Sequence, residues 1–364
     1  MEKTVKISAW QLMALLLVGR IAVALTYTGG AAGVAHGTDR MASLLLEAAL
    51  LLLLFLPTLW YSHAAKGLST LEYAYVQFGR GGAVVAVLYA LYCLYIQCLD
   101  LVQFEHFATT AMSQDIPHVT LCIALVAAAF VAAFYGLEAV ARTAAVIAGL
   151  MLAAIVFLGL SLVPDMEALN FPPLFYDGFT PVLNGALENL PRFLELGVIA
   201  LLTPYVKGVG KGYSFGVLLS AAVVLVMQAT LVGVLGDYGE MVTYPYYTAV
   251  TIAHSSMLQR LDILVAAVWM AGLFVKMAFL AVLFLGCLRQ AFGDKLKVLY
   301  VSLGGLAVLL VGLLLGDTLL AAEHDFLWLA STVLLLAFAA GLPLVLLGAN
   351  ALRVRRRRER GEAL

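Results

Sequence analysis

Long apolar runs recur along the whole of this 364-residue sequence, and they restrict its fold more than any other feature. Wound as a helix, a run of about 18 or more apolar residues crosses the hydrocarbon core of a bilayer. Because 63% of the residues are hydrophobic and only 12% are charged, the chain cannot cover itself with polar surface. The sequence predicts an all-α membrane protein with about ten transmembrane helices. The ten runs cover approximately residues 8–30, 41–61, 83–106, 119–136, 139–163, 182–204, 215–235, 261–288, 298–315 and 326–347.

The first run has a competing interpretation as a secretory signal peptide, because Lys3 and Lys6 precede it. Its length exceeds the ~7–15 apolar residues of a signal peptide, and further runs follow it. We therefore expect this run to be retained as the first membrane span.

Basic residues between the runs predict the orientation in the membrane. With the N-terminus inside, sixteen Lys and Arg residues fall in cytoplasmic segments and only Arg40 falls in an outer loop. Positive charge concentrates on the cytoplasmic side of membrane proteins. We expect both termini in the cytoplasm, a single polytopic domain over residues 1–352, and a basic tail over residues 353–364 that marks the cytoplasmic exit or binds anionic lipid.

The outer connection over residues 236–260 carries apolar residues at helical spacing after Pro245. Tyr244, Tyr246 and Tyr247 suit the headgroup region of a bilayer, so a short interfacial helix is predicted there. An ordinary loop is the alternative.

Signatures of catalysis and of nucleic-acid binding are missing from the sequence. The four cysteines lie inside apolar runs without the spacing of metal ligands, the six histidines are scattered, and no glycine-rich phosphate loop occurs. We expect no catalytic residue, no metal, no cofactor and no nucleic-acid partner, so the chain is not predicted to be an enzyme.

Ionisable residues inside membrane spans are candidate functional residues, because a charge in the bilayer interior costs at least ~2.5 kcal/mol. Glu105 lies near the end of a span and can reach the interface, and Glu188 and Arg192 have the i, i+4 spacing of a helical ion pair. The full set is Arg20, Glu47, Asp100, Glu105, Glu188, Arg192, Glu195, Arg260, Asp262 and Lys276.

Arg20, Asp100, Glu195 and Lys276 lie nearer the middle of their spans. They either form buried ion pairs or line a polar cavity for a solute that carries an ammonium and a carboxylate. Glu195 is followed by Gly197, so the sixth span is predicted to unwind there, and Gly19-Arg20 is a weaker candidate for a break in the first span over residues 20–24. Broken helices expose backbone groups that bind such solutes.

The predicted ligand is a small neutral amino acid. Ionised Asp100 and Glu195 would attract its ammonium, free N–H groups of a broken helix would hold its carboxylate, and the neighbouring side chains are small or aliphatic. In the alternative, Glu195 pairs with Arg192 or Lys276 and backbone groups alone select the ligand. The predicted ligand-binding residues are Arg20, Ala22, Val23, Ala24, Asp100, Glu195, Leu196 and Gly197.

Several motifs are spread over nearly the whole chain: Ile7-Ser8-Ala9-Trp10-Gln11-Leu12, Gly136-Leu137-Glu138 with Arg142, Leu202-Thr203-Pro204, and Tyr244-Pro245 followed by Leu258-Gln259-Arg260-Leu261-Asp262 and Trp269. They resemble those of the endospore germination permeases, which are the B subunits of nutrient germinant receptors. Gln259 and Asp262 depart from the usual Glu of that family, and Ala22-Val23-Ala24 stands where some members carry glycines.

The resemblance places the chain in the amino acid, polyamine and organocation superfamily of transporters. It implies a five-plus-five inverted repeat with a solute site between broken first and sixth helices. It also implies A-type and lipoprotein C-type partner subunits in the inner membrane of the spore. Arg260 and Asp262 are expected to be architectural, by fixing the outer connection to the eighth span.

Two functions fit these expectations best: a nutrient-sensing receptor subunit that signals to partner subunits, and an amino acid permease. A pore without a specific ligand site is a third. The sequence separates the first two poorly, because both need the same pocket.

Overall fold

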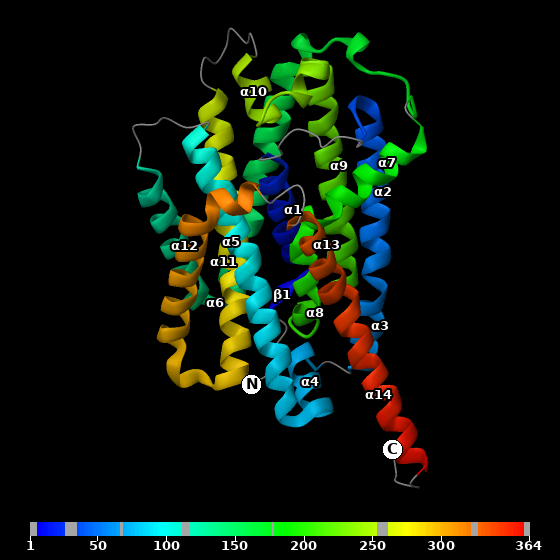
Figure 1. The fold of residues 1–364 in the computed structure, drawn as a ribbon, viewed down its shortest axis with the longest axis vertical. Helices are drawn as coiled ribbons and strands as arrows, with labels where there is room; N and C mark the ends of the chain where they lie inside the picture. Colours follow the sequence, from blue (N-terminus) through cyan, green and yellow to red (C-terminus); the bar gives the residue numbers. More distant parts are fainter. Residues whose placement is uncertain are drawn as a thin grey trace.

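The chain folds into helices that run mostly along one axis of the molecule (Figure 1). The computed structural model describes residues 6–25, 35–65, 68–110, 117–176, 178–252, 261–321 and 327–359. The elements of the first half are β1 (Ile7–Ser8), α1 (Ala9–Leu25), α2 (Gly37–Leu54), α3 (Leu56–Ala64), α4 (Thr70–Phe78), η1 (Gly79–Gly81), α5 (Gly82–Thr110), α6 (His118–Leu162), η2 (Val163–Asp165) and η3 (Ala168–Asn170).

The second half begins with a helix in three pieces and continues with long helices. Its elements are α7 (Phe179–Asn189), the 3₁₀ segment η4 (Leu190–Val198), α8 (Ile199–Leu202), β2 (Val206–Lys207), α9 (Val209–Leu235), η5 (Gly236–Glu240), α10 (Pro245–Ile252), α11 (Leu261–Phe292), η6 (Asp294–Leu296), α12 (Lys297–Ala321), α13 (Trp328–Leu336), the π-helical segment η8 (Ala337–Gly341) and α14 (Leu342–Glu359).

The ten predicted spans are confirmed within the described residues. Seven helical stretches are long and apolar enough to cross a membrane, and one of them, 118–165, holds two spans separated at Gly136. The shorter α1 supplies the first span, and α7, η4 and α8 together supply the sixth. The tail predicted from residue 353 starts inside α14, which continues as a helix to Glu359.

Gly136 makes the turn between the fourth and fifth spans. Its φ of 82° and ψ of −179° lie in a region that is essentially restricted to glycine, whereas the residues on both sides are helical. A β-carbon at this position would meet no atom within 4 Å, so the demand for glycine comes from the backbone alone.

We expect Gly136→Ala to lower the free energy of unfolding by about 1–3 kcal/mol, because alanine disfavours this backbone conformation. Thermal unfolding of the purified protein in detergent would measure the loss. Gly149→Ala is the matched control, since Gly149 lies within helix α6 and also has no neighbour within 4 Å of its β-carbon position. Equal melting temperatures for the two variants would contradict this account.

The N-terminal motif Ile7 to Leu12 starts the first helix. The Ser8 backbone N–H donates to the Gln11 side chain at 2.9 Å, and the Gln11 N–H donates to the Ser8 hydroxyl at 3.3 Å, which is a capping box. Ile7 and Ser8 also pair in parallel with Val206 and Lys207, just after the motif that closes the sixth span. Two motifs that are about 200 residues apart in the sequence therefore meet at one end of the bundle.

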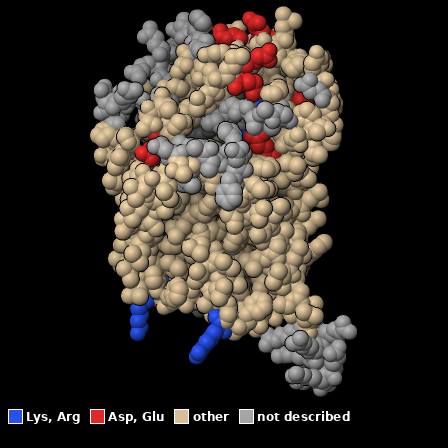
Figure 2. Space-filling view, viewed as in Figure 1, with Lys and Arg blue, Asp and Glu red and all other residues tan. Residues whose placement is uncertain are grey.

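Charges separate toward the two ends of the molecule. Acidic side chains gather at the upper end of the face shown in Figure 2, and the Lys and Arg side chains visible there lie at the lower end. The described end of α14 also lies toward this lower end (Figure 1). The arrangement agrees with the charge bias between loops that predicts the orientation.

The predicted helix in the outer connection is present as α10, and two of the three tyrosines at its start are buried. Tyr244 and Tyr246 are only 6% and 2% exposed, and Tyr244 packs edge-on against Phe107 with ring centroids 5.1 Å apart. These two rings therefore contact neighbouring helices, whereas Tyr247 is half-buried. Burial against neighbouring helices removes more apolar ring surface from water than an interfacial position would.

Candidate functional site

The sixth span is interrupted at η4, as the sequence predicts. Regular α-helix stops at Asn189 and resumes at Ile199, and the sharpest departure is at Phe193, with φ −127° and ψ 47°. Pro191 contributes to the interruption, because proline lacks an N–H to donate within a helix. The predicted break at 195–197 lies inside η4, two residues after this departure.

Tyr92 of α5 holds the interrupted segment in place. Its hydroxyl donates a hydrogen bond of 2.8 Å to the backbone carbonyl of Leu194, which lies within the 3₁₀ segment η4. A β-carbon on Gly197 would lie 2.6 Å from the Tyr92 hydroxyl oxygen and 2.7 Å from its ring carbon Cε1. Gly197 therefore allows the Tyr92 ring to approach the backbone of the break.

Three ionisable side chains meet beside this segment. The Lys276 ammonium of α11 lies 2.6 Å from Asp100 Oδ1 of α5 and 2.6 Å from Glu195 Oε1 of η4. All three residues are at most 5% exposed. We call Asp100, Glu195 and Lys276 the buried triad. The structure thus brings two of the predicted ligand-binding residues together, with Lys276 between them.

Arg20 forms a second buried ion pair. Its Nη2 lies 2.7 Å from Glu47 Oε2 of α2, and its guanidinium carbon lies 5.8 Å from the ring centroid of Phe193 in the break. On the preceding residue, a β-carbon on Gly19 would lie 3.3 Å from Glu195 Oε1. Helix α1 therefore contacts the buried triad at Gly19 and contributes Arg20 to the second ion pair.

The first helix is not interrupted where the sequence predicts. Helix α1 runs continuously through residues 20–24 to Leu25, so that position for the break is wrong, and residues 26–34 lie outside the described part of the chain. Arg20 is neutralised by Glu47 within a regular helix, so its charge does not require the helix to open.

The predicted residues of α1 do not all face the break. The Ala22 carbonyl accepts a 3.0 Å hydrogen bond from Trp269 Nε1 of α11, and a β-carbon on Gly272 would lie 3.4 Å from the Ala22 methyl group. Ala22 thus packs against the eighth span. Val23 and Ala24 are partly exposed, and Leu196 of η4 is buried.

Trp269 joins the last described turn of α1 to an aromatic cluster. Its ring centroid lies 5.5 Å from that of Phe104 and 4.4 Å from that of Phe107. The indole N–H donates to the Ala22 carbonyl and so fixes this turn to the eighth span. Trp269 and Tyr244, two residues of the family-like motif, both pack against Phe107.

We expect Trp269→Phe to lower the free energy of unfolding by about 0.5–1.5 kcal/mol, because phenylalanine keeps much of the ring packing and loses only the hydrogen bond to Ala22. Trp269→Ala should cost about 3–5 kcal/mol by emptying the cluster. Melting temperatures of the two variants would separate the contributions, and an equal loss in both would contradict a role for the rings.

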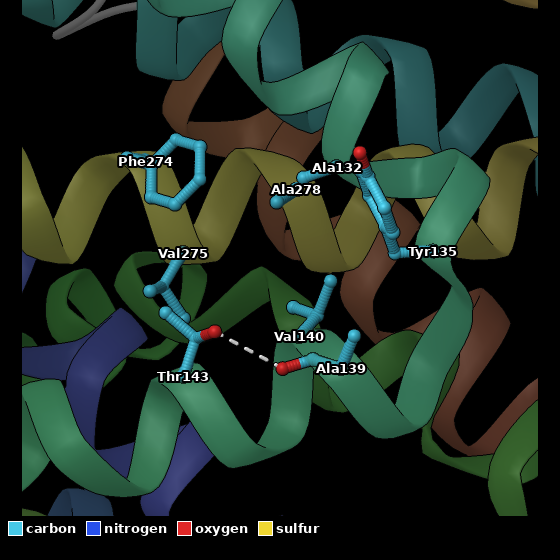
Figure 3. A pocket seen from close by; sticks show the side chains of 8 residues that line it. All are labelled: Ala132, Tyr135, Ala139, Val140, Thr143, Phe274, Val275 and Ala278. Atoms are coloured by element: carbon cyan, nitrogen blue, oxygen red, sulfur yellow. Dashed lines mark hydrogen bonds between the residues drawn. The ribbon is translucent and has the colours of Figure 1, made fainter.

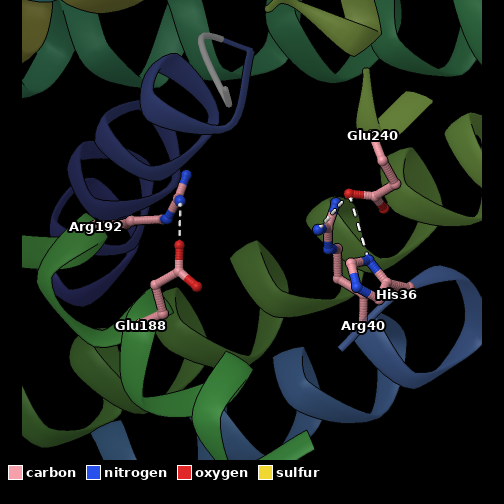
Figure 4. A network of polar contacts seen from close by, with 5 residues as sticks. All are labelled: His36, Arg40, Glu188, Arg192 and Glu240. Atoms are coloured by element: carbon pink, nitrogen blue, oxygen red, sulfur yellow. Dashed lines mark hydrogen bonds and ion pairs between the residues drawn. The ribbon is translucent and has the colours of Figure 1, made fainter. Parts of the chain in front are cut away.

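Further polar contacts lie nearer the outer end, within the sixth span and between the start of α2 and η5 (Figure 4). Arg192 lies 3.5 Å from Glu188, which confirms the predicted i, i+4 pair. Arg40 Nη2 lies 2.9 Å from Glu240 Oε2, and His36 Nδ1 lies 3.7 Å from the same oxygen. Arg260 and the side chain of Asp262 lie outside the described residues, so their architectural role remains a prediction.

A small apolar pocket lies elsewhere, between α6 and α11, on both sides of the Gly136 turn (Figure 3). Its volume is about 190 Å³. The Thr143 hydroxyl on its wall already donates to the Ala139 carbonyl. The pocket is lined by Ala132, Tyr135, Ala139, Val140, Thr143, Phe274, Val275 and Ala278. None of these is a predicted ligand-binding residue.

The alternative in which Glu195 pairs with Lys276 is confirmed. Sequence reasoning missed Glu47 as the partner of Arg20 and the contact between Lys276 and Asp100, because only the packing shows which charges meet. Tyr92 carried no sequence signal, because the chain has 16 tyrosines and most lie in apolar surroundings. Within the described residues, no group of three or more His, Cys, Asp or Glu side chains could hold a metal ion.

Comparison with known proteins supplies the family and the fold type. Residues 6–316 match the model of a family described as spore germination protein. A Bacillus subtilis (strain 168) protein named as the spore germination protein YfkT is 26% identical over 199 residues, or 54% of this chain. The chain spans only 55% of the length of that relative.

Three solved structures have a similar fold. Mhp1, a nucleobase-cation-symport-1 family transporter in a closed conformation with bromovinylhydantoin bound, has a TM-score of 0.67 at 16% identity, over 96% of this chain and 79% of that one. Its inward-facing form scores 0.59 at 13% identity, over 91% and 76%. A Na⁺-coupled sialic acid symporter, outward-open and substrate-bound, scores 0.57 at 12% identity, over 93% and 78%. The chain has the five-plus-five inverted-repeat transporter fold that the family resemblance implies.

Proposed function

The chain belongs to the spore germination protein family, and from this premise we propose that it is a nutrient-sensing membrane subunit of a spore germinant receptor. It binds a small neutral amino acid between the first and sixth helices and signals to A-type and lipoprotein C-type subunits. It lies in the inner membrane of the spore with both termini in the cytoplasm, and it binds its solute without catalysing a reaction.

The interruption of the sixth helix at η4 is the observation that carries this proposal. Backbone groups released from α-helical bonding inside a membrane protein need other partners, and in this fold type such groups face the solute. Helix α1 packs directly against η4, and Phe193, the residue with the strongest departure from helical geometry, lies over Arg20.

The ion pairs decide which groups are left to bind the ligand. Glu195 is engaged by Lys276 and Arg20 by Glu47, so neither charge is free to select an amino acid. The carboxylate and ammonium of the ligand therefore bind to backbone N–H and C=O groups of the interrupted segment. Aliphatic and aromatic neighbours such as Phe193, Leu194 and Leu196 favour a small apolar side chain on the ligand.

Binding would change the conformational equilibrium of the segment that it orders. Since η4 also packs against α13 of the tenth span, a change in η4 can reach the lipid-facing side of the bundle, where partner subunits would bind. The transporter fold of the similar structures supports the second candidate, an amino acid permease.

Equilibrium binding to the purified full-length protein in lipid nanodiscs tests the proposal. Labelled alanine and valine should bind and compete with each other, whereas aspartate and lysine should not. Uptake into proteoliposomes separates the two candidates, because a receptor subunit binds without accumulating solute and a permease does both. Absence of binding to every amino acid in the panel would reject both candidates.

A further inference from the structure

The buried triad contains more negative than positive charge. If Asp100, Glu195 and Lys276 are all ionised, two carboxylates face one ammonium and the group has a net charge of −1. A net charge in the interior of a membrane protein is costly unless something neutralises it. The second buried pair, Arg20 with Glu47, is neutral by comparison.

Asp100 Oδ2 and both oxygens of Glu195 lack a hydrogen-bond partner among the described residues, although Glu195 Oε1 lies 2.6 Å from the Lys276 ammonium as an ion pair. The two residues are only 3% and 2% exposed. Buried polar atoms without a partner are rare and call for an explanation such as a missing ligand or proton. Glu47 Oε1 of the one-to-one pair also lacks a hydrogen-bond partner, so the triad differs from that pair in having unpartnered oxygens together with a surplus negative charge.

We propose that the buried triad is a proton-binding site, in which one proton is held by the carboxyls of Asp100 and Glu195 while Lys276 remains an ammonium. The proton neutralises the surplus charge and turns one acceptor oxygen into a donor. The site is independent of the nutrient proposed above, because neither carboxyl is needed to bind it.

Neighbouring charges do not provide the neutralisation. From α1, Arg20 is paired with Glu47, and from η4, Arg192 is paired with Glu188. Helix α5 adds only tyrosines and cysteines near Asp100, with Glu105 and His106 toward its outer end, and α13 has no ionisable side chain. The exposed Arg142 of α6 pairs with Glu138. At the far end of α11, Arg289 pairs with Asp294, and Lys297 at the start of α12 lies over the Phe134 ring. The described surroundings therefore contain no unbalanced positive charge that could offset the second carboxylate.

A proton fits the group better than a metal cation does. The Lys276 ammonium lies between the carboxylates at 2.6 Å from each, where it would repel Na⁺. Sodium also needs several oxygen ligands, and the ammonium occupies one oxygen of each carboxylate. A proton needs only one free oxygen.

Neutral isosteric variants of the full-length protein test the proposal by their melting temperatures. Asp100→Asn and Glu195→Gln should each leave the melting temperature at neutral pH nearly unchanged, because the remaining carboxyl is ionised, or releases its proton to solvent, and then forms a neutral one-to-one pair with Lys276. The double variant should lose about 10 °C or more, because Lys276 then has no anionic partner. Glu47→Gln is the matched control and should be destabilising alone, since it breaks a one-to-one pair.

Two further measurements decide the outcome even if the double variant does not fold. Infrared difference spectra between neutral and alkaline pH should show the C=O band of a protonated carboxylic acid in the wild type and in Glu47→Gln, and should lack it in either single variant of the triad. Replacing Na⁺ by choline should not shift the melting temperature. Three results would each overturn the proposal. The first is a loss of melting temperature in the double variant that equals the sum of the losses in the two single variants. The others are a wild-type spectrum without the carboxylic acid band, and a higher melting temperature in Na⁺ than in choline.

Discussion

Replacing Lys276 with methionine should lower the free energy of unfolding by about 3–5 kcal/mol, the largest loss that we expect from a single change of charge in this protein. Methionine keeps most of the length and apolar surface of the side chain, but Asp100 and Glu195 lose the ammonium that lies 2.6 Å from each. Lys276 also lies on α11, and 72% of the residues in the most apolar stretch of this helix are buried inside the protein. Water therefore cannot replace the ammonium that the two carboxylates lose. Thermal unfolding in detergent and abundance in the membrane would both report the loss.

Two variants control this experiment. Lys211→Met changes an exposed lysine near the start of α9 and should leave stability within about 0.5 kcal/mol of the wild type. Combining Lys276→Met with Asp100→Asn and Glu195→Gln removes every charge of the triad and should restore much of the lost stability. If the triple variant were no more stable than Lys276→Met alone, the loss would come from packing and not from unpaired charge.

Gly197→Leu should abolish the response to a small neutral amino acid. The first side-chain carbon alone would lie 2.6 Å from the Tyr92 hydroxyl, so the ring must move and release the Leu194 carbonyl. Overpacking of this kind costs about 1–3 kcal/mol, and it changes the segment whose backbone groups are proposed to bind the ligand.

Binding of labelled alanine to the purified variant would measure the effect, with Gly149→Leu as the matched control. Gly149 is exposed on α6, and its β-carbon position has no neighbour within 4 Å, so leucine there faces lipid. A folded Gly197→Leu variant that bound alanine with unchanged affinity would place the ligand site away from η4.

The sequence alone determined the number and order of the spans, because each span depends on a local property. A stretch that is long and apolar enough must cross the bilayer as a helix whatever it packs against. The break in the sixth span was predictable for a similar reason, since proline at 191 and glycine at 197 weaken a helix wherever they occur.

Only the tertiary structure decided which charges meet. Arg20, Asp100, Glu195 and Lys276 were equally credible as parts of a cavity or of ion pairs. The packing of α11 against α5, beside Glu195 of η4, placed Lys276 between two carboxylates. It also paired Arg20 with Glu47, so that α1 continues as a helix to Leu25. Pairing is set by distances of a few ångströms between side chains on helices far apart in the sequence, and hydropathy contains no information about those distances.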